Sequence, residues 1–123
     1  MESVFVEGRV TRGRKLGRTL GFPTANIVLD YPLDVPDGVY RSRVWIEERV
    51  YDGMSNLGCN PSVGGCTRRL ETYIFDFDGL LYDRMIRVEL VEKIREEQCF
   101  DSMSALRRQI EEDRIEILRR IRS

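Results

Sequence analysis

The sequence predicts a mainly β protein, a closed β-barrel followed by one C-terminal α-helix. Short segments rich in β-branched residues alternate with glycine, proline and aspartate at intervals of about ten residues, which is typical of barrels. After Ser102 the apolar period changes from that of a strand to that of a helix. The length of 123 residues suits one domain covering 1–123, with the barrel at about 3–95 and the helix at about 102–122.

The first strands lie between glycine-rich and proline-containing breaks. Segments 4–10 and 24–29 carry β-branched residues and are predicted to be strands. Segment 38–46 follows, and Glu47 and Glu48 are predicted to turn the chain into a further strand at 50–54. The spacing therefore predicts a hairpin.

The middle of the chain mixes turn residues with apolar runs. By composition, 60–65 is predicted to be a turn or mobile loop, and 70–75 a strand. Asp78 and Gly79 predict a second hairpin, which leads into 85–94, where apolar and charged residues alternate.

The last segment has the apolar spacing of an amphipathic helix. Asp101 or Ser102 can cap its N-terminus, and three arginines near residue 120 complement the dipole at the other end. One face is predicted to pack on the barrel through Met103, Leu106, Ile110, Ile117 and Ile121.

Composition excludes several classes of function. The net charge of −1 argues against non-specific nucleic-acid binding, and no apolar run approaches the length of about 20 residues that a membrane span needs. With no signal peptide recognisable, we expect a cytoplasmic protein that binds neither membrane nor nucleic acid. Cys59, Cys66 and Cys99 are expected to be reduced thiols. Since histidine is absent, a general base must be a carboxylate, a lysine or a tyrosine.

A basic, glycine-rich segment near the N-terminus indicates phosphate binding. Glycines at 13, 17 and 21 alternate with basic residues that include Arg12 and Arg18. Backbone N–H groups of such a loop can approach an anion while the side chains neutralise it. The segment fits neither the Walker A nor the dinucleotide-binding pattern, and a solvated turn is the alternative interpretation.

Thr24 and Asn26 follow this loop and favour a metal site. Residues two apart on a strand share a face, so a hydroxyl and an amide oxygen would lie side by side. Neutral oxygen ligands suit Mg²⁺, which takes the rest of its shell from water and nucleotide phosphates. The alternative to a metal site is a purely structural role, in which Thr24 favours the strand conformation and Asn26 favours a turn.

Segment 20–27, Leu-Gly-Phe-Pro-Thr-Ala-Asn-Ile, resembles the signature of the ATP-dependent riboflavin kinase family, as in the C-terminal kinase domain of bifunctional FAD synthetases. Further blocks resemble the family in the same order, at 38–40, 56–62, 70–73, 76–82 and 94–102. The resemblance extends from about Gly8 to Asp113. It implies a six-stranded antiparallel, Greek-key barrel with a C-terminal helix.

The resemblance also implies an activity, transfer of the γ-phosphate of ATP to the 5′-hydroxyl of riboflavin, which gives FMN and ADP. Glu71 resembles the family's catalytic base, and Thr24 and Asn26 its Mg²⁺ ligands, with zinc or manganese as alternatives in place of magnesium. The nucleotide positions correspond to Gly13, Arg18, Thr24, Ile74 and Tyr82, and the flavin positions to Arg95 and Phe100.

The chemistry agrees with these roles. Phosphoryl transfer depends mainly on positioning and charge neutralisation, so it needs no histidine. Glu71 has the apolar neighbours Leu70 and Ile74, and a carboxylate partly removed from water is a stronger base. The sequence departs from the family at Tyr73, where a histidine is common, and at Ser62, Asp83, Gln98 and Cys99.

Two other functions stay open at this stage. One is a flavin- or nucleotide-binding module without catalysis, and the other a small barrel that binds nucleic acid. In many bacteria the family's kinase module follows an FMN adenylyltransferase domain, whereas the resemblance here covers only the kinase. We therefore expect kinase activity alone, in a monomer, from either a natural single-domain protein or an excised half of a longer one.

Overall fold

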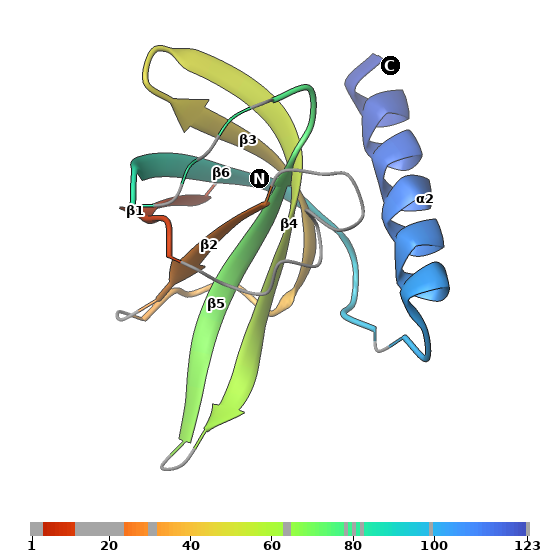
Figure 1. Cartoon of the computed structure of the whole chain (residues 1–123), viewed down its shortest axis with the longest axis horizontal. Coiled ribbons are helices and arrows are strands. Elements are labelled where there is room, and N and C mark those ends of the chain that lie inside the picture. The colour runs from red at the N-terminus through yellow and green to blue at the C-terminus, as the bar shows by residue number, and fades with distance from the viewer. Residues whose placement is uncertain are drawn as a thin grey trace.

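The computed structural model describes residues 4–11, 24–29, 32–62, 65–77, 79, 81, 83–98 and 100–122. Within these residues, six strands precede one helix near the C-terminal end of the chain (Figure 1). The elements are β1 Val4–Arg9, β2 Thr24–Val28, β3 Gly38–Ile46, β4 Arg49–Ser62, β5 Gly65–Ile74, β6 Met85–Arg95 and α2 Met103–Arg122. The predicted class, mainly β with a C-terminal helix, is confirmed.

The strands form one antiparallel sheet in the order β1-β6-β3-β4-β5-β2. Three consecutive strands, β3 to β5, are joined as hairpins, and β2 returns to lie beside β5. This is a Greek-key connection. The six antiparallel strands and the Greek key agree with the family resemblance.

The two edges of the sheet meet at one point in the described part of the chain. Thr11, just after β1, forms an isolated bridge with Asn26 of β2, and its N–H donates to the Asn26 carbonyl at 2.8 Å. Among the described residues, this bridge is the only pairing between the two edges of the sheet, and β1 and β2 form no ladder with each other. The expected closed barrel is therefore a curled, partly open one.

The hairpin between β3 and β4 turns where the sequence predicts, at Glu47 and Glu48. Glu47 adopts a φ of 57°, in the left-handed region. The prediction of a loop at 60–65 is wrong for most of that segment, because β4 continues to Ser62 and β5 begins at Gly65. Proline and glycine had suggested a loop, yet Pro61 pairs in register with Cys66 in a long hairpin that projects from the barrel (Figure 1).

The second predicted hairpin, at Asp78 and Gly79, is wrong. β5 pairs with β4 and β2, whereas β6 pairs with β3 and β1, so the two strands that this turn separates are not neighbours. The segment between them crosses from one part of the sheet to another. Turn residues reveal where the chain reverses, but they do not reveal which strand it then joins.

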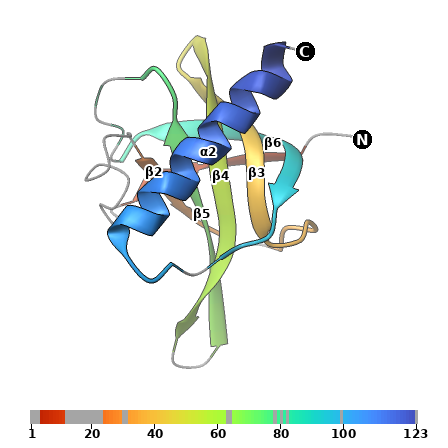
Figure 2. The same ribbon diagram turned by 90° about the vertical axis from the view of Figure 1, so that its right-hand side faces the viewer.

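Two apolar clusters form on opposite faces of the sheet. The larger fills the barrel interior and includes Tyr40, Leu70 and Ile74. The smaller lies outside the barrel, where Val39, Met54 and Tyr73 contact Ile110 and Ile117 of α2. Figure 2 shows α2 crossing the outer face of the sheet in front of β4.

The predicted helix begins and packs much as its sequence suggests. Ser102 is the cap, because its Oγ accepts the N–H of Ala105 at 3.1 Å. Ile110 and Ile117 are buried, while the two end positions of the predicted face are partly exposed, Met103 by 43% and Ile121 by 37%.

One expectation about the cysteines is wrong, since Cys59 is disulfide-bonded. It lies on β4 opposite Arg68, and Cys66 stands two positions farther along the same neighbouring strand. Irregular spacing in the sequence gave no reason to expect a bond, because the register of this hairpin was not predicted. Cys99 lies outside the described residues.

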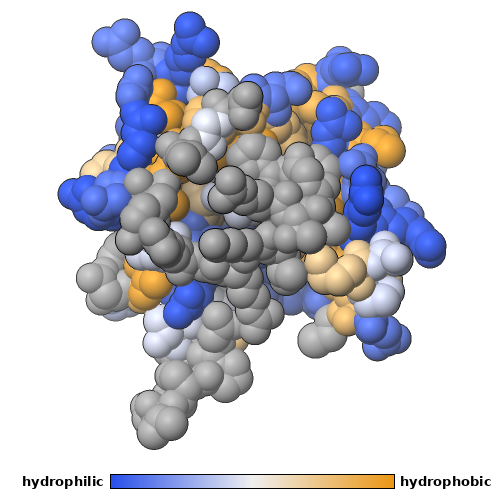
Figure 3. Space-filling model, in the orientation of Figure 1, coloured by the Kyte–Doolittle hydropathy of each residue, from blue (hydrophilic) through white to orange (hydrophobic). Residues whose placement is uncertain are grey.

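The face of the molecule drawn in Figure 3 carries both hydrophilic and apolar residues. Hydrophilic residues lie along the margins of the face in Figure 3, with smaller apolar areas between them. No helix in the described part of the chain combines the length and apolar character needed to cross a membrane.

Candidate active site

The outer face of β2 and β5 brings the predicted metal and catalytic residues together. In the antiparallel register Thr24 lies opposite Tyr73, and Asn26 lies opposite Glu71. Directly opposite residues point to the same side of a sheet. Since Ala25 between them belongs to the barrel core, all four side chains belong to the outer face.

The same register continues across the sheet. Glu71 lies opposite Asn56 of β4, Asn56 opposite Val39 of β3, and Val39 opposite Arg95 of β6. Residues that are far apart in the sequence thus form one row over five strands, from Asn26 to Arg95. The row passes beside the cluster on which α2 packs, so the helix forms one wall of the site.

Glu71 is held by its neighbour on the same strand. The hydroxyl of Tyr73 donates to Oε1 of Glu71 at 3.1 Å. Burial raises the pKa of Tyr73, the adjacent Glu71 carboxylate raises it further, and the charge of Arg95 opposes the change. Tyr73 therefore keeps its proton at neutral pH and is a constant donor that orients the carboxylate.

Thr24 and Asn26 could hold a hard cation. They occupy alternate positions of one short strand, and Asn26 is directly opposite Glu71. Neutral hydroxyl and amide oxygens fit Mg²⁺ that keeps water and phosphate ligands, and they do not fit zinc, which prefers nitrogen and sulfur. Among the described residues no three His, Cys, Asp or Glu side chains form a metal cluster.

Arg95 anchors the helix. Its Nε donates to Oδ1 of Asp113 at 3.0 Å and its Nη2 to Oδ2 at 2.8 Å, while Nη1 donates to the Glu96 carbonyl at 3.0 Å. Gln109 donates to the same carboxylate at 3.0 Å. The pair fixes the end of β6 to the middle of α2, and thereby both ends of the connection that contains Phe100.

The remaining predicted site residues do not all lie on the outer face of β2 and β5. Phe100 is half-buried in the connection between β6 and α2. Ile74 is fully buried in the barrel core, so its backbone is the part that a nucleotide could contact. Gly13, Arg18 and Tyr82 lie outside the described residues.

Two residues that the sequence analysis did not assign also belong to this face. Oδ1 of Asn56 and Nε of Arg69 are buried and have no hydrogen-bond partner in the described structure. Asn56 lies opposite Glu71, and Arg69 precedes Glu71 by two positions on β5. The strand predicted here ended at Met54, whereas β4 continues to Ser62, so Asn56 fell outside the predicted strand.

The carboxylate of Glu97 lies over Gly58 of β4. A Cβ atom at Gly58 would come within 2.1 Å of Glu97 Oε1, so only glycine leaves room for this contact. Burial raises the pKa of Glu97, and the nearby Asp37 raises it further. The connection after β6 therefore rests directly on the strand that carries Asn56.

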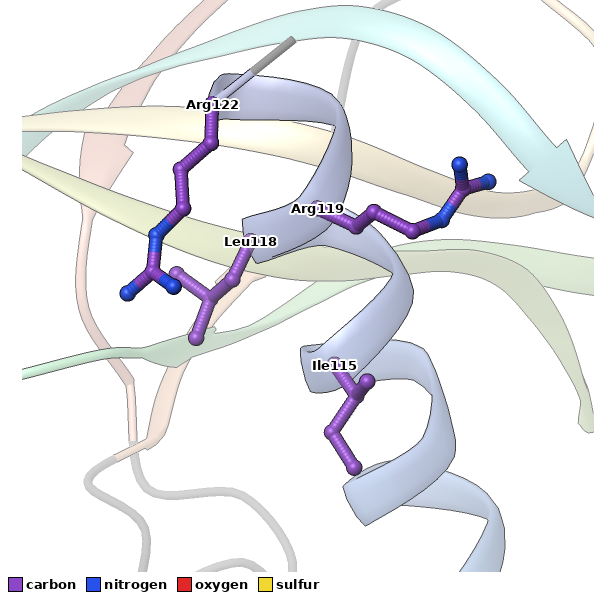
Figure 4. A pocket seen from close by; sticks show the side chains of 4 residues that line it. All are labelled: Ile115, Leu118, Arg119 and Arg122. Atoms are coloured by element: carbon purple, nitrogen blue, oxygen red, sulfur yellow. The ribbon is translucent and has the colours of Figure 1, made fainter.

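Two surface grooves lie elsewhere. One of about 450 Å³ is lined by Ile115, Leu118, Arg119 and Arg122 along the outer side of α2 (Figure 4). Another, of about 370 Å³, includes Trp45, Met85 and Arg87. Neither is lined by the candidate residues described above, whose chemistry is the stronger indication of a site.

Known proteins resemble this chain over most of its length. The profile of the family described as "Flavokinase: Riboflavin kinase" matches residues 1–121. The bifunctional riboflavin kinase/FMN adenylyltransferase of Haemophilus influenzae is 43% identical over 107 residues, covering 86% of this chain and 35% of the relative. This chain thus spans about a third of the length of such curated relatives.

Solved structures agree in fold. A crystal structure named as a macrolide-efflux protein from Streptococcus pneumoniae superposes with a TM-score of 0.81 at 37% identity, covering 89% of this chain and 36% of the other. The riboflavin kinase of Trypanosoma brucei superposes with a TM-score of 0.66 at 24% identity, covering 100% of this chain and 82% of the other. The second likeness supports the fold alone.

Proposed function

Since this chain belongs to the riboflavin kinase family, we propose that it transfers the γ-phosphate of ATP to the 5′-hydroxyl of riboflavin, giving FMN and ADP. The observation that carries the proposal is the direct register of Asn26 with Glu71. It brings a ligand for a nucleotide-bound cation next to a carboxylate that can act on the attacking hydroxyl.

Glu71 is the general base. Its carboxylate accepts the proton of the 5′-hydroxyl as that oxygen bonds to the γ-phosphorus and the bond to the β-γ bridging oxygen breaks. The hydrogen bond from Tyr73 restricts the carboxylate to one orientation. A base that is already oriented has less freedom to lose when the substrate arrives.

Thr24 and Asn26 would hold Mg²⁺, with manganese as an alternative. When bound, the cation neutralises phosphate charge and orients the γ-phosphate. Thr24 also belongs to the proposed nucleotide site, with Gly13 and Arg18 over the phosphates. Ile74 and Tyr82 also contact the nucleotide in this proposal.

Arg95 and Phe100 serve the flavin in this proposal. The guanidinium of Arg95 donates hydrogen bonds to Asp113 and to the Glu96 carbonyl. Arg95 therefore contributes to flavin binding by positioning the connection that carries Phe100. Phe100 is then the residue that would stack on the flat isoalloxazine ring. We further propose that residues 1–123 form one kinase domain, which is a monomer in the cytoplasm and needs neither a membrane nor a nucleic acid.

The test is to incubate the purified chain with riboflavin and MgATP, and separately with CTP, and to separate the flavins by chromatography. We expect FMN to accumulate with ATP and to depend on Mg²⁺. If riboflavin and ADP bind but no FMN forms with either nucleotide, the chain is instead a binding module without catalysis. Size-exclusion chromatography tests the monomer.

A further inference from the structure

The hairpin of β4 and β5 extends beyond the rest of the sheet. β3 pairs with β4 only as far as Leu57, and β2 pairs with β5 only as far as Arg69. In the described part of the chain, residues 58–62 and 65–68 therefore form strand pairs only with each other. We call these two segments the ribbon, and Figure 1 shows it projecting from the barrel. A two-stranded ribbon is at best marginally stable in water by itself.

The ribbon contains a disulfide-bonded cysteine. Cys59 of β4 forms a disulfide and is half-buried. The chain has only two other cysteines, Cys66 and Cys99. Cys59 is opposite Arg68, and Cys66 precedes Arg68 by two positions, so the positions of Cys59 and Cys66 belong to one face of the ribbon. The register therefore favours Cys66 as the partner.

A disulfide is unusual in the compartment that we propose for this protein. The cytoplasm keeps most thiols reduced, and the disulfides that form there are usually transient and redox-sensing. Cys59 is half-buried rather than enclosed in the core, and a disulfide that a thiolate can reach is the kind that is readily reduced. This bond is therefore suited to opening and closing.

One arm of the ribbon supports the flavin side of the candidate site. Gly58 is the first residue of the ribbon on β4, and the carboxylate of Glu97 lies so close over it that no side chain would fit there. Glu97 belongs to the connection between β6 and α2 that also carries Phe100. The position of that connection thus depends on the backbone next to Cys59.

The other arm is attached to the segment before β3. Arg68 donates from Nη1 to the Leu33 carbonyl and from Nη2 to the Val35 carbonyl, each at 2.7 Å. It also pairs with Asp37 at 2.7 Å. Since Arg68 lies opposite Cys59, the disulfide is next to this attachment as well.

We propose that a disulfide between Cys59 and Cys66 is a redox switch that sets the affinity for riboflavin through the order of the ribbon. This inference rests on the proposed function, because it assigns a regulation to the flavin side of that site. With the bond closed, the two arms stay paired and Gly58 supports the connection after β6. With the bond open, the ribbon separates more often and the connection loses this support.

The switch works by thiol–disulfide exchange with a dithiol. A thiolate of the dithiol attacks one sulfur of the bond, which gives a mixed disulfide and releases the other cysteine as a thiolate that takes up a proton. The second thiol of the dithiol then displaces the remaining cysteine. Two electrons and two protons pass from the dithiol to the cysteines, and the dithiol becomes a disulfide. Exchange with an external disulfide reverses these steps.

The test compares the full chain in its oxidised form with the same chain reduced by dithiothreitol. The proteins are wild type, Cys59→Ser, and the control Cys99→Ser, which keeps both proposed partners. Digestion without reductant, followed by mass spectrometry, identifies the bonded pair. Hydrogen exchange at 58–62 and 65–68 measures the order of the ribbon, and KM and kcat for riboflavin measure the site.

We expect oxidised wild type and Cys99→Ser to yield a peptide that links Cys59 to Cys66. Reduction should speed hydrogen exchange in the ribbon and raise the KM for riboflavin severalfold, and oxidised glutathione should restore both. The value of kcat should change little, because Glu71 lies where β5 pairs with both β4 and β2. Cys59→Ser should behave like reduced wild type with or without dithiothreitol.

Other results would overturn the inference. A peptide linking Cys59 to Cys99 would do so, and so would oxidised protein without any disulfide. An unchanged KM after reduction, even with faster exchange in the ribbon, would leave the bond a purely structural link. If neither form makes FMN, the proposed function fails, and riboflavin affinity measured by flavin fluorescence then decides about the switch in the same way.

Discussion

Arg95 at the end of β6 holds Asp113 in the middle of α2 through paired hydrogen bonds, the shortest of them 2.8 Å between Nη2 and Oδ2. The Asp113 side chain is only 6% exposed and that of Arg95 20%. A carboxylate this deeply buried needs its cation, because an unpaired charge in such a place is strongly unfavourable.

Asp113→Ala should therefore lower the free energy of unfolding by about 3 kcal/mol, measured by urea denaturation, because it leaves Arg95 without its partner. The matched control on the same helix is Glu116→Ala, which removes ion pairs to Arg119 and Arg120 on the more exposed side. That change should cost no more than about 1 kcal/mol. Equal losses in the two variants would contradict a special role for the Arg95 pair.

Glu71→Gln should reduce kcat for FMN formation by about 100-fold or more, because an amide cannot accept the proton of the attacking hydroxyl. Binding of riboflavin and ADP, followed by fluorescence and calorimetry, should change little. Glu48→Gln, an exposed change at the β3–β4 turn, is the control and should keep wild-type kcat. A Glu71→Gln enzyme with wild-type kcat would remove Glu71 from its proposed role.

Tyr73→Phe should alter stability at alkaline pH. The pKa of Tyr73 is raised above 10.0, so from about pH 10 upward the unfolded chain binds fewer protons than the folded one at this residue. The contribution of Tyr73 is fully present below pH 10 and is lost as the pH rises toward the folded-state pKa. Urea denaturation from pH 8 to 11 should show a shallower alkaline loss of stability for Tyr73→Phe than for wild type.

The same variant tests how Glu71 is oriented. Loss of the hydrogen bond from Tyr73 removes a group that favours the charged carboxylate, so the acid limb of the pH profile of kcat should move to higher pH. An acid limb that stays in place would show that Tyr73 does not influence the base.

A row of buried hydroxyl groups crosses the barrel interior. Ser42 donates to Ser55 at 2.7 Å, and Ser55 is 2.7 Å from Thr72, with all three side chains buried. Ser55→Ala removes the central member and leaves two polar neighbours, so it should cost about 1–3 kcal/mol of unfolding free energy. Ser104→Ala, on the exposed side of α2, should cost much less. Flavin binding should not change in either variant, because the row faces away from the site.

Gly58→Ala should affect binding more than stability. The new methyl group would overlap Oε1 of Glu97, which is the movable end of a side chain, so the fold can accommodate it. The segment after β6 must then shift, and the KM for riboflavin should rise severalfold. The double variant Gly58→Ala/Glu97→Ala removes the overlap and should restore most of the affinity. Failure of this rescue would show that Gly58 matters for another reason.

The sequence predicted the parts of the site that depend on local pattern. Thr24 and Asn26 share a face because strands alternate, and the helix from residue 103 follows from its apolar period and its cap at Ser102. Pairing between distant strands could not be predicted in this way. The opposition of Asn56 and Glu71 requires a register that no single segment encodes, and Asn56 lies beyond the predicted end of its strand at Met54.

Arg95 shows the same limit. Its position in a family block suggested a flavin contact, but its partner Asp113 is eighteen residues away, on the otherwise apolar face of α2. In the sequence, Asp113 only interrupts the apolar face that Ile110 and Ile117 form, and nothing in that pattern indicates a partner for it. Only the packing of α2 against β6 reveals that the carboxylate has a buried cation opposite it.

The short length of β2 has a consequence for how the site responds to its substrates. This edge strand carries both proposed metal ligands, and among the described residues it is held by pairing with β5 and by the single bridge from Thr11. Edge segments of this kind open locally at a lower free energy than the centre of a sheet. A nucleotide whose cation is bound by Thr24 and Asn26 would make this strand open less often. The backbone amides of 24–28 should therefore exchange hydrogen more slowly when MgADP is present.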